Sequence, residues 1–511
     1  MTATFTPHIG SFNASSFIKS LQVTQPLLWE TGKTYNIGDT VFYDNGKYVA
    51  STTGVSGNLP PTHTTGVQND GTVNWIFVES IITNDSFRGN LYFYIANNMP
   101  WTDENTPDIP VIKDISDYTL LDNIITLQKI NYTDLKLGIH RYNWLTGTVY
   151  AQYTSQNNIH DYLLPFYVLT DDLNIYKCLN NNNGATSTSK PTGTSTGIIN
   201  LADGYAWKFL GTIQPQDSSN YLTSDYFPVE YKVYNDGSAQ WNTQQNAKAK
   251  SISTFDLIAQ HGTFTTPAVT IQGIGTGADG FATKTLGNGI RQILLSNCGQ
   301  DYAIETYAIV TESTAVGTGA TAHATIAAGV ITGITIDLAG FGYTNATVLI
   351  YGDGTLATAT ATIAVDSSIQ AITVTNGGTG YTFAKIFVIA GLAGAIGKAV
   401  LAPINGHGSN LVAELGSNTI IIGVRLQTND YFLTGSTSDF RQTGIITDLK
   451  AFDGTTATAN YYLAPSHPDY DTTLTLNKIK KGSGYILYLS NITAVVRSTG
   501  QEEFIKIGLS F

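Results

Sequence analysis

The sequence predicts an all-β protein, with a multidomain β-sandwich core and two inserted small β modules. Its 511 residues include 50 glycines and 29 tyrosines, and only 13% of them are charged. Tyrosine suits the pleated, half-buried surface of a sheet, and glycine supplies the positive φ angles that hairpin turns require. Residues 330–336 and 371–375 alternate apolar and polar side chains, which is typical of strands, whereas helical periodicity is scarce.

Charge and composition exclude several classes of partner. The formal net charge is −12, and no run of lysine or arginine is longer than Lys480-Lys481. Because nucleic-acid binding requires clustered cations, nucleic acid is not an expected partner. No apolar stretch approaches the roughly 20 residues that span a bilayer, and the first residues lack a signal-peptide pattern, so no membrane insertion is expected. Cys178 and Cys298 lie far apart in the sequence and indicate two buried thiols in a protein made in a reducing cytoplasm.

Changes in composition divide the chain into a core and two insertions. Residues 27–79 form a separate module, because a proline precedes them, a polar turn follows them and three candidate strands lie between. Residues 262–402 form a low-charge tract that is rich in alanine, threonine and glycine. The predicted core then consists of an N-terminal segment, a first part and a C-terminal part, which are residues 1–26, 80–261 and 403–511.

The tract 262–402 contains an internal repeat. A glycine–tyrosine motif occurs three times at intervals of 41 and 38 residues, and a strand pattern follows each copy. Each copy predicts a hairpin, a Gly-Tyr turn and a further strand, and such copies must stack or share one sandwich to bury their apolar faces. The motifs and their strands are Gly299–Tyr302 with 308–311, Gly340–Tyr343 with 347–351, and Gly378–Tyr381 with 385–390.

Sequence patterns associated with catalysis occur here only in turn-rich segments. Gly193–Gly197 fits the nucleophile-elbow pattern, but no helix-forming sequence follows it. Gly275–Gly280 fits the dinucleotide-binding pattern, and a near copy at Gly317 assigns these glycines to the turns of the repeat. His407 lies between two glycines in a tight loop that leads to Glu414, which favours a local structural hydrogen bond. We therefore expect no enzymatic activity, no metal site and no cofactor.

Aromatic residues punctuate the module 27–79 in a recognisable order. With the glycine, aspartate and proline residues between them, the order is Trp29, Tyr35, Gly38, Asp39, Val41, Gly46, Tyr48, Pro60, Pro61, Trp75. This order resembles the small chitin-binding-type carbohydrate modules, in which exposed rings stack on sugar faces. The resemblance implies that Trp29, Tyr35, Tyr48 and Trp75 face a sugar. The alternative is that these rings form the core of a module too small to bury much else, and that the module serves packing or docking.

Five further elements lie outside the two insertions and follow one another in a specific order. They are Gly89–Ile95 with Pro100–Glu104, Tyr176–Leu179, Lys190–Gly193 with Asp203–Phe209, Phe440–Thr447, and Gly500–Phe511. Each element alone is a weak signal, but their order resembles the baseplate wedge protein, the eighth gene product type, of T-even-like contractile-tailed phages.

That resemblance implies a structural subunit located in the tail baseplate of the virion and made in the host cytoplasm. The family forms a homodimer inside each wedge, contacts other baseplate wedge proteins, and has no enzymatic activity or cofactor. The two insertions add surface that can reach a tail fibre or a glycan. Assembly interfaces favour aromatic residues, so we expect subunit contacts at or near Trp101, Trp207, Lys190 and Pro191.

Two alternative functions remain open at this point. The first is a glycan- or receptor-binding tail protein that acts through residues 27–79. The second is a polysaccharide-degrading tail enzyme, which requires two carboxylates about 5–10 Å apart. The adjacent Asp171 and Asp172 do not make such a pair, because neighbouring residues of a strand point to opposite faces.

Overall fold

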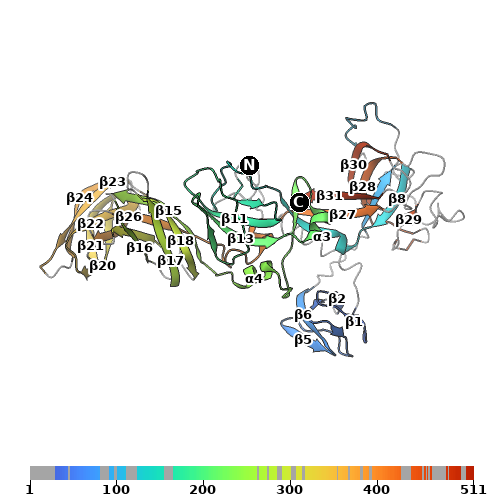
Figure 1. The fold of residues 1–511 in the computed structure, drawn as a ribbon, viewed down its shortest axis with the longest axis horizontal. Coiled ribbons are helices and arrows are strands. Elements are labelled where there is room, and N and C mark those ends of the chain that lie inside the picture. Colours follow the sequence, from blue (N-terminus) through green and yellow to red (C-terminus); the bar gives the residue numbers. More distant parts are fainter. Residues whose placement is uncertain are drawn as a thin grey trace. The chain divides into compact units, whose positions relative to one another are not determined.

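The computed structural model confirms the all-β fold class, with several antiparallel sheets and only short helices (Figure 1). It describes residues 29–510 with gaps, of which the longest are 81–90, 111–122, 155–164, 427–438 and 463–478. The N-terminal segment 1–26 lies outside the described residues. The chain forms two compact units, one from 1–141, 213–236 and 415–511, and the other from 142–212 and 237–414.

The predicted module 27–79 has its own sheets and its own core. Four strands pair in the order β2-β3-β6-β5, and β1 pairs with β4. The three strands expected from the sequence correspond to β2, β3 and β6. Their bounds are β1 (Thr34–Tyr35), β2 (Thr40–Tyr43), β3 (Gly46–Ala50), β4 (Gly54–Val55), β5 (Val67–Asp70) and β6 (Val73–Ser80).

The first unit also contains a β-sandwich. One sheet has the order β29-β8-β7-β28-β30 and the other has the order β14-β9-β27-β31. Alternate residues of β7, including Phe93, share a core with Ile422 of β27 and Ile507 of β31, so the two sheets pack face to face. The bounds are β29 (Tyr461–Tyr462), β8 (Ile124–Lys129), β7 (Leu91–Ala96), β28 (Phe440–Thr447), β30 (Tyr485–Val495), β14 (Tyr226–Val229), β9 (Leu135–His140), β27 (Thr419–Leu426) and β31 (Glu503–Ser510), with the short helices η2 (Tyr132–Asp134) and α3 (Pro215–Tyr221).

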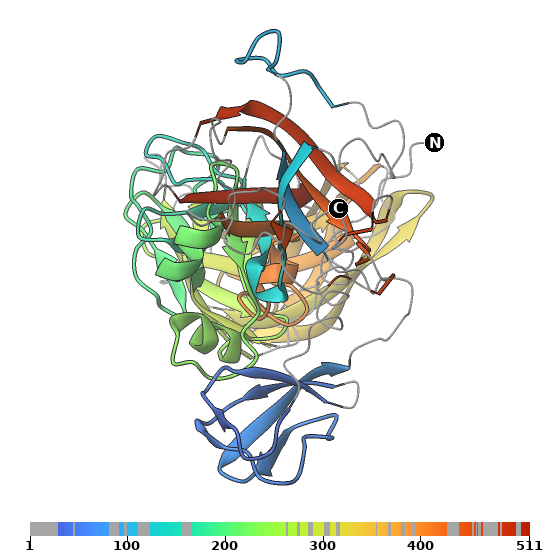
Figure 2. The ribbon, with the colours of Figure 1, turned by 90° about the vertical axis from the view of Figure 1, so that its right-hand side faces the viewer.

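The second unit begins with a four-stranded sheet, here called the base sheet, in the order β10-β11-β13-β12. Strands β11 and β13 of this sheet are labelled in Figure 1, and the short helices α3 and α4 are drawn in green in Figure 2. Helix α4 is capped at its N-terminus by Ser238, whose hydroxyl accepts a hydrogen bond from the Trp241 amide. The bounds are β10 (Tyr167–Leu169), β11 (Asn174–Asn181), β12 (Ile198–Asn200), β13 (Tyr205–Thr212) and α4 (Ala239–Gln245).

The remaining strands of this unit form the repeat domain, which we define as residues 252–401. They pair in a six-stranded sheet, β16-β19-β26-β15-β18-β17, a four-stranded sheet, β21-β20-β25-β22, and a hairpin, β23-β24. The bounds are β15 (Ile252–His261), β16 (Pro267–Gln272), β17 (Thr276–Lys284), β18 (Ile290–Gln300), β19 (Tyr307–Glu312), β20 (Thr318–Ala327), β21 (Val330–Phe341), β22 (Ala346–Gly352), β23 (Thr355–Ile363), β24 (Ile369–Thr379), β25 (Ala384–Ala390) and β26 (Gly394–Leu401).

This division differs from the predicted domains in two ways. The repeat domain starts at Ile252 rather than at residue 262, because β15 pairs along its length with β26. The predicted core segment 80–261 is shared between the two units. The amino-acid composition marks neither boundary. The pairing of β15 with β26, for example, joins residues that are far apart in the sequence.

Each copy of the repeat has the predicted form, a long antiparallel hairpin followed by one strand. The hairpins are β17–β18, β20–β21 and β23–β24, and the strands that follow are β19, β22 and β25. In the second copy, Tyr343 is 2% exposed and its hydroxyl accepts a hydrogen bond from the Ala320 amide at 3.2 Å. The ring covers Gly317 and Gly340, where an added Cβ would lie 2.6 Å and 2.8 Å from it. The tyrosines of the other two motifs lie outside the described residues.

Candidate functional site

The predicted sugar-facing rings of the module form its core instead. Tyr35, Tyr48 and Trp75 are at most 1% exposed, and the rings of Tyr35 and Trp75 meet edge to face at 4.9 Å. A sugar therefore has no access to these three rings, which corrects the expectation drawn from the carbohydrate modules. The reason is size, since a module this small uses its large rings to fill its interior.

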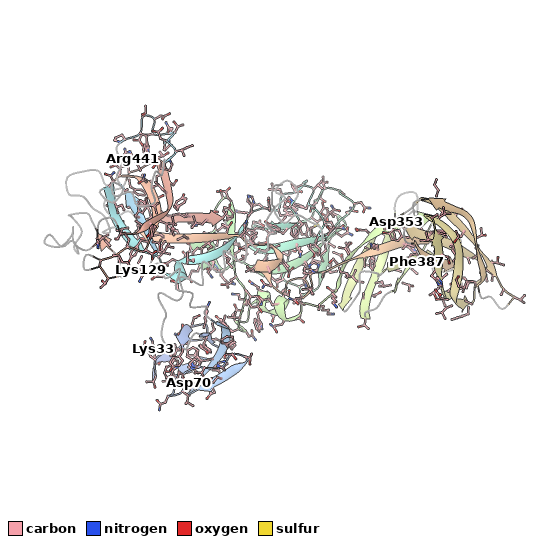
Figure 3. All side chains as sticks on the ribbon, turned by 180° about the vertical axis from the view of Figure 1, so that it is seen from behind. Lys33, Asp70, Lys129, Asp353, Phe387 and Arg441 are labelled. Carbon is pink, nitrogen blue, oxygen red and sulfur yellow. The ribbon has the colours of Figure 1, made fainter. Side chains whose placement is uncertain are left out.

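Trp29, the fourth predicted ring, is half-buried and donates a hydrogen bond to a carboxylate that the sequence did not indicate. Asp70, labelled in Figure 3, is 1% exposed. Its Oδ2 accepts hydrogen bonds from Trp29 Nε1 at 2.8 Å and from Trp75 Nε1 at 3.4 Å. Its Oδ1 accepts one from the Leu59 amide at 3.3 Å. The large apolar side chains that the module exposes within its described part are aliphatic: Ile37, Val55, Leu59 and Val67.

Trp101 belongs to a loop that is fixed to the first unit's sandwich at three points. Its Nε1 donates a hydrogen bond to the Ile492 carbonyl of β30 at 2.9 Å. Glu104 accepts from Nε of Arg441 of β28, the residue labelled in Figure 3, at 2.8 Å, and the Asp108 carbonyl accepts from the Asn491 side-chain amide at 2.7 Å. Two of the elements that carry the family resemblance, 100–104 and 440–447, therefore contact each other directly.

Trp207 lies inside the second unit and not at its surface. It is 0% exposed, and its ring meets those of Tyr150 at 5.5 Å and Tyr205 at 5.7 Å. A fully buried ring cannot contact another subunit, so the expected subunit contact at this residue is corrected to a role in the core. The sequence singled out Asp203–Phe209 as an element, but both faces of β13 are covered, which an apolar run alone does not reveal.

The loop with Lys190 and Pro191 is ordered by polar contacts on its flanks. Lys190 Nζ pairs with Asp171 Oδ1 at 2.6 Å and with Asp172 Oδ2 at 3.0 Å. Its positive charge, through that hydrogen bond, lowers the pKa of Asp171. Pro191 is buried, and Asp203 Oδ2 accepts from the Ser189 amide at 2.9 Å. Lys190 is half-buried and its two aspartates are exposed, so these three are accessible to another molecule, whereas Pro191 is not.

A buried polar cluster lies in the second unit, and we call it the Lys177 cluster. It consists of Lys177 on β11, Ser253 on β15, His407, Glu414 at the end of α5 (Leu411–Glu414), and the ring of Tyr153. Lys177 Nζ pairs with Glu414 Oε2 at 3.0 Å, and the two side chains are 0% and 4% exposed. Ser253 Oγ lies 2.6 Å from His407 Nε2. The Gly408 amide donates to Glu414 Oε1 at 2.6 Å. The hydrogen bond of His407 itself is not the local one expected, because its partner Ser253 lies 154 positions away in the sequence.

Burial and charge set the protonation states of this cluster. Burial, with the charge of Lys177 beside it, lowers the pKa of His407 from 6.5 to about 4, so the imidazole is neutral at pH 7. Burial is the largest single influence and raises the pKa of Glu414, but the charges and hydrogen bonds of its neighbours, with the charge of Lys177 first among them, together outweigh burial and hold that pKa at about 2. Lys177 Nζ lies 3.9 Å from the centroid of the Tyr153 ring, which adds a cation–π contact.

The arrangement of Ser253, His407 and Glu414 is similar in part to a Ser-His-acid triad. His407 Nδ1, however, lies 3.7 Å from Glu414 Oε2, which is too long for a hydrogen bond. Ser253 is 3% exposed, so a substrate carbonyl cannot reach its hydroxyl in this conformation. The geometry therefore favours a structural role for the cluster. One local signal for the cluster is present in the sequence, namely the histidine between two glycines.

Comparison with protein-family models and with curated proteins finds no match for this chain. Among the residues that the structure describes, no group of three or more histidine, cysteine, aspartate and glutamate side chains could hold a metal ion. Within the same residues, no helix has the length and hydropathy needed to cross a membrane. Cys178 is buried, and burial raises the pKa of its thiol well above the ordinary value.

Proposed function

We propose that this chain is a structural subunit of a phage tail baseplate wedge, which holds neighbouring baseplate proteins together for assembly and sheath contraction. In this proposal the chain carries out no reaction and needs no cofactor. It acts in the virion after synthesis in the host cytoplasm, as a homodimer in contact with other wedge proteins.

The observation that carries the proposal is how the elements of the family resemblance pair with one another. β7, in the first element, lies antiparallel to β28, in the fourth, with Ile95 opposite Thr443. β11, in the second, lies antiparallel to β13, in the third, with Cys178 opposite Trp207. Short motifs that resemble a family by chance have no reason to be strand partners. Their pairing supports the interpretation that they belong to two folded cores.

The composition supports the same proposal. Interfaces of permanent assemblies are poor in charge and rich in aromatic residues, and this chain has 13% charged and 11% aromatic residues. Persistent contacts also need an interface above roughly 1,000 Å², which a chain made of extended sheets offers.

Purified virions test the proposal directly. We expect mass spectrometry to find the chain in isolated baseplates, and light scattering of the recombinant protein to give a mass near twice 54.9 kDa. Replacement of the half-buried Trp101 by alanine should then reduce incorporation into baseplates. Absence of the chain from baseplates of a phage that encodes it would refute the proposal.

The alternative, a glycan- or receptor-binding tail protein, loses its main support because three of the four expected rings are buried. A glycan array with the full chain separates the two functions. Binding that is abolished by Trp29→Ala would favour the alternative, since Trp29 is the one predicted ring that is half-buried rather than enclosed.

A further inference from the structure

The Lys177 cluster lies where the chain enters and leaves the repeat domain. Ser253 is the second residue of β15, the first strand of that domain, and β26, the last strand, ends shortly before His407. Ile252 is opposite Leu401 in the sheet, and the Ala402 amide donates to the Ser251 carbonyl at 2.8 Å. The entry and the exit of the repeat domain are therefore adjacent.

The cluster joins both of these segments to the base sheet. His407 contacts Ser253 on the entry strand, and Glu414 after the exit strand pairs with Lys177 in the middle of β11. Asn180 of β11 adds a hydrogen bond to Thr254 Oγ1 at 2.9 Å. One group of buried polar side chains thus connects three segments that are far apart in the sequence.

We propose that the Lys177 cluster is an acid-sensitive lock, in which neutral His407 holds the ends of the repeat domain to the base sheet and protonated His407 releases them. The release is a local opening of residues 403–414 and of the start of β15. The hairpins of the repeat domain stay folded, because their registers involve none of the cluster residues.

The charges around His407 explain why its protonated form is incompatible with the closed cluster. Lys177 faces it from β11 and Lys208 acts on it from β13, while Glu414 is the one carboxylate beside it among the described residues. The remaining neighbours are neutral, namely the Ser253 hydroxyl and the edge-on Tyr153 ring at 4.9 Å. The closed cluster therefore holds more positive than negative charge once His407 is protonated, in a site without access to water.

The direction and size of the pH effect follow from linkage. In the opened state, His407 is exposed to water and binds its proton with the ordinary pKa of 6.5, whereas in the closed state that pKa is about 4. Acid therefore favours the opened state, and the effect develops as pH falls from 6.5 to 4. Over that range the opening equilibrium shifts by a factor on the order of 10². Glu414, with its pKa lowered to about 2, adds a second loss in the same direction at lower pH.

Hydrogen exchange of the full chain, corrected for the pH dependence of intrinsic exchange, tests the lock between pH 7 and pH 4.5. We expect residues 252–256 and 403–414 to lose protection in acid while the hairpin 318–341 keeps it. His407→Gln, which keeps a hydrogen-bonding group but does not titrate, should abolish the response. His323→Gln is the matched control, because His323 is exposed and paired with Asp337 in that hairpin, and its response should equal that of the wild type.

Two results would overturn the proposal. The first is a loss of protection in acid that is equal in 403–414 and in the hairpin 318–341, since that is general unfolding. The second is an unchanged acid response in Lys177→Met. Without the lysine charge, protonated His407 becomes the partner of Glu414, so this variant should open at clearly lower pH than the wild type. If His407→Gln does not fold, the acid response of Lys177→Met still tests the proposal.

Discussion

Truncation of Trp207 separates a role in folding from a role in assembly. The side chain is 0% exposed, stacks on the ring of Tyr205 and meets the ring of Tyr150 edge to face. A buried tryptophan covers about 150–250 Å², which corresponds to about 4–6 kcal/mol at 25 cal/mol per Å². Because the neighbouring strands relax partly around a cavity, we expect Trp207→Ala to lower the local free energy of unfolding by about 3–5 kcal/mol.

Native-state hydrogen exchange of β11 and β13 measures this loss in the intact chain. The expected loss accelerates exchange of their amides by about 10²–10⁴-fold, while the strands of the first unit keep their rates. Trp207→Phe is the matched control. It retains an aromatic ring and removes an Nε1 that has no hydrogen-bond partner in the described structure, so its cost should stay below about 2 kcal/mol. If the exchange rates of β11 and β13 are unchanged in Trp207→Ala and the variant still fails to assemble, the reasoning is refuted. Trp207 would then act as a subunit contact, as the sequence predicted.

Three further substitutions test how glycines and a carboxylate support the sheets. Gly444→Ala should destabilise the first unit by about 2 kcal/mol or more, measured by urea denaturation, because an added Cβ would lie 2.4 Å from the Tyr94 ring. Gly340→Ala should cost about 1–3 kcal/mol in hydrogen exchange of the second repeat hairpin, since φ is +65° and Cβ would lie 2.5 Å from the Thr318 carbonyl. Asp70→Asn should lower the thermal stability of the module, followed by tryptophan fluorescence, because a carbonyl oxygen accepts the two indole hydrogen bonds more weakly. No measurable loss in any one of these variants would contradict the contact it tests.

The sequence was sufficient for features that depend on local pattern. Alternation and turn residues predicted the strands 308–311, 347–351 and 385–390, which correspond to β19, β22 and β25. The repeat was also visible, since the same hairpin chemistry recurs at near-constant spacing. Such features need no knowledge of what packs on either face of a strand.

Side-chain environment could not be predicted in the same way. Tyr48 and Trp75 suit both a sugar-binding surface and a small core, and only the tertiary fold distinguishes the two. The Lys177 cluster was still harder to foresee, because Lys177 lies 237 positions from Glu414 and Ser253 lies 154 positions from His407. Contacts between residues so far apart in the sequence depend on sheet topology, which cannot be read from a short stretch of sequence.

The strand order of the first sandwich has a consequence for synthesis on the ribosome. β7 is covered on both faces in the folded chain, yet its partner β28 follows it by roughly 350 residues, which takes about 20–70 s at 5–20 residues per second. During that interval the whole second unit emerges and its hairpins, which pair with near neighbours, are free to fold. An apolar strand that stays unpaired with β28 for this long is a target for chaperones. The yield of soluble protein should therefore depend on the speed of translation between β8 and β28.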